Sequence, residues 1–169
     1  MMSSASFLRD RRGAAAAEMA LVAPLLCTIL LGSVELGSYF YNEHILVKAV
    51  RDGARFAARQ SFTNYSCSGA PTGTVVADTR ALVRTSVLSG GTDRFADIQD
   101  SDITISTSCK TAQGGQSMVN GIYRGMPTGA PIVRVSATVD YTPVIGAAFG
   151  FSGVGLHLNA AQEAAVMGI

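Results

Sequence analysis

Side chains suited to catalysis, metal binding or nucleic-acid binding are scarce in this chain of 169 residues. There are two histidines, three cysteines and no C-x-x-C pair, and neither His44 nor His157 lies in a nucleophile or metal motif. The formal net charge is +1, without the basic excess typical of nucleic-acid binding. We therefore expect no enzyme, no metal or other cofactor, no nucleic-acid partner and no small-molecule substrate.

Apolar side chains, in contrast, form one long run near the N-terminus. Residues 19–34 carry no charge, and Glu18 and Glu35 bracket them. Extended to Tyr41, the run has roughly 23 residues, which as a helix of about 35 Å is long enough to cross a bilayer. Arginines precede the run, so the positive-inside rule keeps the N-terminus cytoplasmic. The sequence thus predicts a single-pass transmembrane segment at about residues 19–41.

An ordinary cleaved secretory signal is the main alternative to an anchor. Its apolar core would be residues 19–31, followed by a small-residue cleavage site. The chain continues as GSVELGSYF, which lacks a clean A-x-A and carries an acid. A lipoprotein signal fits less well, because Leu25 and Leu26 precede Cys27 where small residues would be needed. We therefore favour the anchor.

The same helix is expected to continue beyond the membrane. Residues 42–60 contain no proline and are rich in helix formers. Either one basic face of this segment is solvated, with Asp52 pairing locally to Lys48 or Arg55, or it contacts lipid headgroups or acidic groups of a neighbouring subunit. Glu35 likewise either lies at the outer interface or pairs with a basic residue of another subunit. Spacings of three and four place four residues on the basic face: Lys48, Arg51, Arg55 and Arg59.

The N-terminal sequence resembles a known family. The stretch RRGAAAAEMALVAPLL, followed by ELG and by AVRDGARFAA, is similar to the TadE-like proteins, which are pilin-like components of the tight-adherence (Flp-type) pilus and related bacterial secretion machinery. The resemblance implies that a prepilin peptidase cuts after Gly13, so that Ala14 becomes the mature N-terminus and Glu18 the fifth mature residue. Residues 1–13 would be the leader, and their loss would leave a formal charge of about −1.

Glu18 has a physical role that agrees with this resemblance. A charged carboxylate costs about 2.5–3.5 kcal/mol at the centre of a bilayer, and less near an interface. After cleavage, the new ammonium of Ala14 would lie one helical turn away, or across to a neighbouring subunit, and would offset much of that cost together with the helix dipole. In an assembled bundle this pairing would favour one axial register. The alternative is a carboxylate that only caps the helix start at the interface.

Beyond a long helix at residues 14–60, residues 61–169 predict a small α+β domain. Its first segment, residues 61–74, is rich in Ser, Thr, Gly and Asn, as in a loop with turns. Residues 74–88 have helical periodicity, and Ser89-Gly90-Gly91 is expected to end that helix.

The rest of the domain predicts an antiparallel sheet of about three to four strands. Residues 113–130 are glycine-rich, and residues 143–151 predict a short helix or turn. Alternating apolar and polar residues indicate strands in three segments: 102–109, 131–141 and 156–166.

The three cysteines differ in their expected surroundings. Cys27 lies in the apolar run and is expected to act as a small hydrophobe. Cys67 and Cys109 fall in the outer domain, where an oxidising periplasm would let them pair. Closing that loop of about 43 residues would contribute ~4 kcal/mol in the chain-entropy model. The alternative is two free thiols.

These features together predict a pilin-like minor component of a tight-adherence pilus or related secretion system. It would lie in the bacterial inner membrane, with its C-terminal domain in the periplasm, and could enter an extracellular pilus. Its expected partners are the membrane, a prepilin peptidase, and the major pilin, other pilin-like subunits or the assembly platform. The alternatives are a signal-anchored periplasmic accessory protein that never enters a filament, and a secreted hydrolase, which the missing catalytic residues disfavour.

Overall fold

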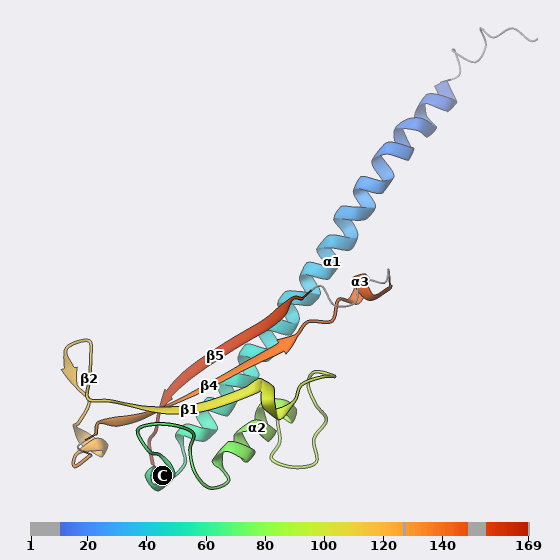
Figure 1. Cartoon of the computed structure of the whole chain (residues 1–169). Coiled ribbons are helices and arrows are strands. Elements are labelled where there is room, and N and C mark those ends of the chain that lie inside the picture. The colour runs from blue at the N-terminus through green and yellow to red at the C-terminus, as the bar shows by residue number, and fades with distance from the viewer. Residues whose placement is uncertain (1–10, 127, 149–154, 169) are drawn as a thin grey trace, which may run out of the picture.

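A long helix carries a small domain on its C-terminal half, which confirms the expected α+β class (Figure 1). The computed structural model describes residues 11–126, 128–148 and 155–168. The elements are α1 (Arg11–Ala58), α2 (Val75–Thr85), β1 (Ile103–Lys110), β2 (Ala112–Gln113), β3 (Gln116–Ser117), β4 (Ala130–Asp140), α3 (Val144–Ala148) and β5 (His157–Ala165), with 3-10 turns at Phe62–Asn64, Asp100–Asp102 and Gly121–Tyr123.

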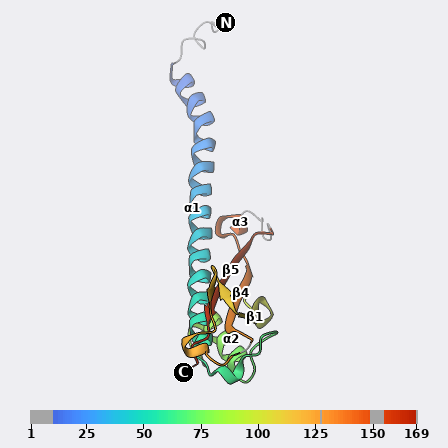
Figure 2. The same cartoon turned by 90° about the vertical axis from the view of Figure 1, so that its left-hand side faces the viewer.

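The N-terminal half of α1 projects away from the domain. The helix has 48 residues, a length of about 72 Å. It continues through Pro24, and the Thr28 hydroxyl donates to the carbonyl of Pro24 at 2.8 Å. Figures 1 and 2 show this half free of the domain, and its most apolar window has no buried residue. By length and composition, α1 is able to cross a membrane.

The C-terminal half of α1 forms one side of the domain core. Glycine and alanine protrude little from the buried face of this half, so neighbouring elements approach the backbone of the helix closely. A Cβ added at Gly53 would lie only 2.5 Å from Cγ2 of Val83 in α2. The buried face consists of residues three or four positions apart: Leu46, Ala49, Val50, Gly53, Ala54, Ala57 and Ala58.

The main sheet packs one face against α1 and leaves the other polar. Its strands are antiparallel in the order β1-β4-β5, so β4 lies in the middle. Ile105 of β1 lies opposite Val135 of β4, which in turn lies opposite Gln162 of β5. Residues of β4 alternate between the two faces: Val133, Val135, Ala137 and Val139 are buried, whereas Arg134, Thr138 and Asp140 are exposed and Ser136 is partly so.

Three segments differ from the expectation or extend it. The prediction that Ser89-Gly90-Gly91 ends the second helix is wrong: α2 ends at Thr85, because Ser86 adopts φ 72° and its N–H donates to the Leu82 carbonyl at 2.9 Å. The glycine-rich segment contains the small hairpin β2–β3, whose turn residues Gly114 and Gly115 both have positive φ. Residues 149–151 of the predicted short helix or turn lie outside the described residues, and α3 occupies Val144–Ala148.

Candidate functional site: the projecting helix and its junction with the domain

The projecting half of α1 exposes a continuous apolar surface. Leu21 is 80% exposed and Leu25 61% exposed, and such side chains occur on all sides of the helix. A helix that is apolar all round is stable only when lipid or other protein covers it. The large apolar residues exposed on this segment are Met19, Leu21, Val22, Leu25, Leu26, Ile29, Leu30, Leu31 and Val34.

The predicted processing site lies at the start of α1. Gly13 and Ala14 are exposed and helical, so the bond between them lies in the first turns of the helix. Of the predicted leader, residues 1–10 lie outside the described residues, and residues 11–13 belong to α1. Glu18 is exposed and makes no hydrogen bond or ion pair with any residue that the structure describes. If cleavage after Gly13 occurs as the sequence predicts, the new ammonium of Ala14 would lie four residues from this carboxylate.

Glu35, in contrast, is bound within the chain. Its Oε1 accepts from the hydroxyl of Tyr141 at 2.6 Å and from the N–H of Val144 at 3.2 Å, and its Oε2 accepts from the N–H of Ile145 at 2.8 Å. Charge-assisted bonds of this kind are stronger than neutral ones. From the sequence, Glu35 was expected either at the outer interface or paired with a basic residue of another subunit, and neither expectation includes this contact. The sequence gives no local signal for it, because the partners lie 106 to 110 positions further along the chain. Glu35 thus joins α1 to the start of α3.

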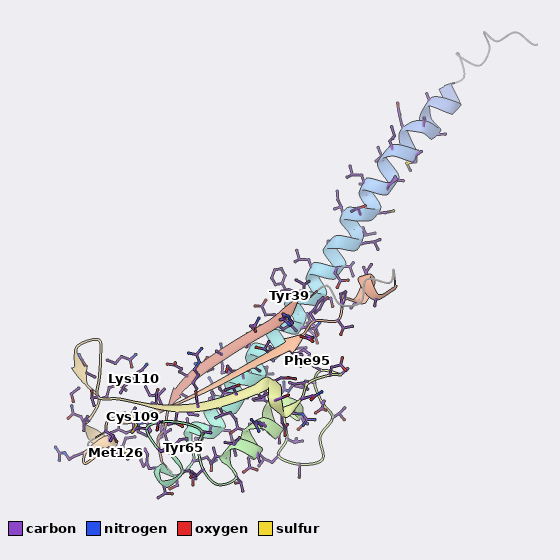
Figure 3. The ribbon with its side chains drawn as sticks, viewed as in Figure 1. Tyr39, Tyr65, Phe95, Cys109, Lys110 and Met126 are labelled. Atoms are coloured by element: carbon purple, nitrogen blue, oxygen red, sulfur yellow. A yellow bond between two sulfur atoms is a disulfide. The ribbon has the colours of Figure 1, made fainter. Side chains whose placement is uncertain are left out.

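Aromatic residues complete this contact, which we call the junction (Glu35, Tyr39, Tyr141, α3 and Leu156). The rings of Tyr39 and Tyr141 pack edge to face with centroids 5.2 Å apart, and the Tyr39 hydroxyl donates to the His157 carbonyl at 3.4 Å. Burial, with a smaller effect from the bond to Glu35, raises the pKa of Tyr141. Figure 3 shows Tyr39 where α1 leaves the domain.

An apolar groove lies beside the junction. It has a volume of about 370 Å³ and opens between α1 and the end of the sheet. Its lining residues are Gly32, Glu35, Leu36, Tyr39, Tyr141 and Leu156.

The predicted basic face is exposed on the side of α1 that is turned away from the domain core. Its four residues, Lys48, Arg51, Arg55 and Arg59, are all exposed, and none forms an ion pair among the described residues. Likewise, no ion pair joins Asp52 to Lys48 or Arg55 among these residues. The four positive charges remain free for solvent, lipid or another subunit.

The two outer-domain cysteines meet at the far end of the domain. Cys67 and Cys109 form a disulfide with their Cα atoms 4.9 Å apart, whereas Cys27 is a free, exposed thiol on the projecting helix. The N–H of Thr107 also donates to the carbonyl of Gly69 at 2.7 Å. The loop after α1 is therefore tied along the outer edge of β1, where Figure 3 labels Cys109.

The described residues contain no cluster suited to metal binding. His157 Nδ1 lies 2.6 Å from Asp140 Oδ1, but both side chains are at least half exposed on an open surface. Within residues 11–126, 128–148 and 155–168, no group of three or more His, Cys, Asp or Glu residues is placed to hold a metal ion. The distinctive surfaces are instead the projecting helix, the junction and the basic face.

Comparison with known proteins identifies one family. Residues 13–55 match the family described as TadE-like protein, which confirms the resemblance over this segment. No curated protein and no solved structure gives a significant match to the chain. The matched segment begins at Gly13 and contains Glu18, Glu35 and most of the basic face, so it coincides with the projecting helix, the α1 side of the junction and much of the helix that the domain covers.

Proposed function

Because residues 13–55 match the TadE-like family, we propose that the protein is a pilin-like minor component that helps to assemble a tight-adherence (Flp-type) pilus or a related secretion system. It acts by contacts of its helix and domain with other subunits, and not by catalysis. The family match supports a pilus-associated, pilin-like role in general. The observation that carries the finer proposal is a single helix whose apolar first half is exposed and whose second half is the spine of the domain.

The projecting half would hold the protein in the bacterial inner membrane before assembly. From Ala14 to Val34 the helix has about 21 residues and rises about 31 Å, which matches the hydrocarbon thickness of a bilayer. Arginines before the apolar segment favour a cytoplasmic N-terminus and a periplasmic domain. An outer boundary at Tyr41 remains a prediction from the sequence.

Two observations favour retention of this helix over its removal as an ordinary signal. α1 is continuous through Leu31–Glu35, where a signal peptidase would have to cut. Glu35, directly after that stretch, is hydrogen-bonded to Tyr141 and α3, so the helix and the domain are one unit there.

Peptidase processing would convert the start of this helix into an assembly contact. Cleavage after Gly13 creates the Ala14 ammonium, and Glu18 then lies four residues away on the same side of the helix. In the membrane the two groups offset each other's charge, within one subunit or between neighbours. Subunits in the wrong axial register would leave a carboxylate unpaired in an apolar environment, at a cost that reaches about 2.5–3.5 kcal/mol at the bilayer centre and is smaller near the interface.

The basic face and the free surface of the domain would supply further contacts. Lys48, Arg51, Arg55 and Arg59 point away from the domain core and have no partner among the described residues. In a filament they would meet acidic groups of a neighbouring subunit, and in the membrane-bound state the nearest of them would approach lipid headgroups. The major pilin, other pilin-like subunits and the assembly platform are the proposed protein partners.

N-terminal sequencing of the protein purified from its native membrane tests the proposal most directly. A start at Ala14 is the expected result, because it shows prepilin-type processing. An intact start at Met1 or Met2 would instead support a signal-anchored accessory protein that never enters a filament. A start beyond Ser33 would support an ordinary secreted protein and would contradict both membrane-bound forms.

A further inference from the structure

The end of the domain nearest the projecting helix exposes apolar side chains. Figures 1 and 2 both place α3 beside α1 at this end, away from the C-terminus. Val144 of α3 is 60% exposed, and Leu156, just before β5, is 47% exposed. On α1 at the same level, Leu36 is 55% exposed. These residues continue the apolar surface of the projecting helix onto the domain.

This end of the domain is also free of charge in sequence. Residues 141–156 contain no Asp, Glu, Lys, Arg or His, and the next residues on either side are Asp140 and His157. Those two flanking side chains pair with each other at 2.6 Å on the polar face of the sheet. The uncharged stretch therefore coincides with the connection that contains α3.

Glu35 is the only charged residue of α1 between Met19 and Asn42, and its carboxylate is hydrogen-bonded inside the junction. Its carboxylate accepts from the Tyr141 hydroxyl and from the N–H groups of Val144 and Ile145. A carboxylate with these donors costs much less to bring near hydrocarbon than a free one. The junction can thus approach the bilayer without exposing a carboxylate that lacks hydrogen-bond donors.

The length of the helix places the junction at the membrane surface. If the apolar core begins near Ala14, about 21 residues cover the roughly 30 Å of hydrocarbon, and its outer edge falls at Val34, next to Glu35. If the span extends instead from Met19 to Tyr41, the junction lies deeper still. Both placements bring α3 and Leu156 to the outer leaflet.

We propose that α3, Leu156 and the groove of about 370 Å³ beside them form a second membrane contact, in which lipid of the bilayer crossed by α1 covers the groove. The occupant is lipid because the groove includes Gly32 and Leu36 of α1 and is therefore continuous with the surface that the membrane already covers. Apart from the hydrogen-bonded Glu35, the lining residues carry no charge. This contact rests on the proposed membrane anchoring, and it holds the domain at one height and tilt until the subunit leaves the membrane.

The absence of tryptophan from the chain allows a direct test with single-tryptophan variants. The full-length protein is reconstituted into vesicles of phosphatidylethanolamine and phosphatidylglycerol, with or without brominated acyl chains. Val144→Trp and Leu156→Trp should show blue-shifted emission and a loss of emission with brominated lipid that approaches the loss for Leu26→Trp, within the span. Ala161→Trp, on the solvent face of β5, should keep the emission of an exposed indole.

The outcomes separate this contact from the anchoring on which it rests. Quenching of Leu26→Trp without quenching of Val144→Trp and Leu156→Trp would overturn the second contact and leave the anchor intact. Failure to quench Leu26→Trp would contradict the anchor itself. A blue shift at Val144→Trp that brominated lipid does not quench, and that grows with protein density, would assign the groove to a second copy and overturn the lipid assignment. Circular dichroism of each variant checks that it is folded, and the two independent positions prevent one misfolded variant from deciding the result.

Discussion

The two halves of α1 belong to one uninterrupted helix but have opposite surfaces. The projecting half carries Leu, Ile, Val and Met, which are exposed, whereas the domain half carries mostly Ala, Gly and Val on the side where it is buried. Large side chains suit a fluid or separately folded partner that can adapt to them. Small side chains suit a fixed neighbour such as α2, whose backbone can then approach closely. Side-chain size thus distinguishes the exposed half of α1 from the half that the domain covers.

The two glutamates that bracket the apolar run show the same contrast. Glu18, in the projecting half, has no hydrogen-bond partner among the described residues. Glu35 has three donors from the domain within 3.2 Å. Within the described residues, one carboxylate is therefore unpaired, and the other is held by a contact inside the chain.

Loss of the disulfide should have the largest effect on stability, and this effect should be confined to the domain that covers the C-terminal half of α1. Replacing Cys67 and Cys109 by serine removes a crosslink that spans 42 positions, and should lower the free energy of unfolding of the domain by about 4 kcal/mol in the chain-entropy model. Chemical denaturation in detergent, followed by circular dichroism, measures the change. Cys27→Ser is the control, because this exposed thiol contacts no part of the domain core. Equal effects of both replacements would contradict the distinction.

A glycine-to-alanine pair tests the close packing of the domain half. Gly53→Ala must displace the buried Val83 side chain and should cost about 1–3 kcal/mol of domain stability, as overpacked cores do. Gly37→Ala, on the same helix but with no heavy atom within 4 Å of the added Cβ, should leave the domain unchanged and favour the helix by up to about 1 kcal/mol. Denaturant midpoints of the two variants provide the comparison. A neutral Gly53→Ala would mean that α1 and α2 are less tightly packed than the structure shows.

Exchanging the two glutamates for glutamine should give opposite results. Glu35→Gln weakens the bonds to Tyr141, Val144 and Ile145, so the amide hydrogens of α3 should exchange faster, while processing remains normal. Glu18→Gln should leave exchange in the domain unchanged and reduce filament assembly at normal membrane level and normal processing. Hydrogen exchange and electron microscopy of filaments measure the two effects. Assembly at the normal level in Glu18→Gln would contradict the register role.

The smallest expected effect concerns pH and is confined to the domain. Burial raises the pKa of Tyr65 from 10.0 to about 12, and its hydroxyl donates to the carbonyl of Ala57 in α1. Because deprotonation is harder in the folded state, this contribution to stability is complete below pH 10 and is lost as the pH rises toward 12. Tyr65→Phe should therefore show a shallower loss of stability over that interval. If the free energy of unfolding fell equally with pH in both proteins up to pH 12, the attribution of this pH dependence to Tyr65 would be contradicted.

The regular elements could be predicted because their patterns are local. The strands at residues 103–110, 130–140 and 157–165 follow the alternation of apolar and polar residues, and the long helix follows its uninterrupted helix formers. The end of α2 was mispredicted because Ser86 took the left-handed conformation that was expected of glycine. The hairpin β2–β3 was missed because strands of two residues have too few positions to show a pattern.

By itself, the sequence determined that an apolar segment of membrane length lies near the N-terminus, that residues 13–55 match the TadE-like family, and that an α+β domain follows. These properties depend on neighbouring residues, which composition and periodicity record directly. Only the tertiary structure decided that Glu35 bonds to α3, that Gly53 is a packing position, and that Val144 and Leu156 lie beside the exit of the helix from the domain. Those contacts join residues far apart in the chain, and their partners are set by the packing of the sheet on α1, which no local pattern encodes.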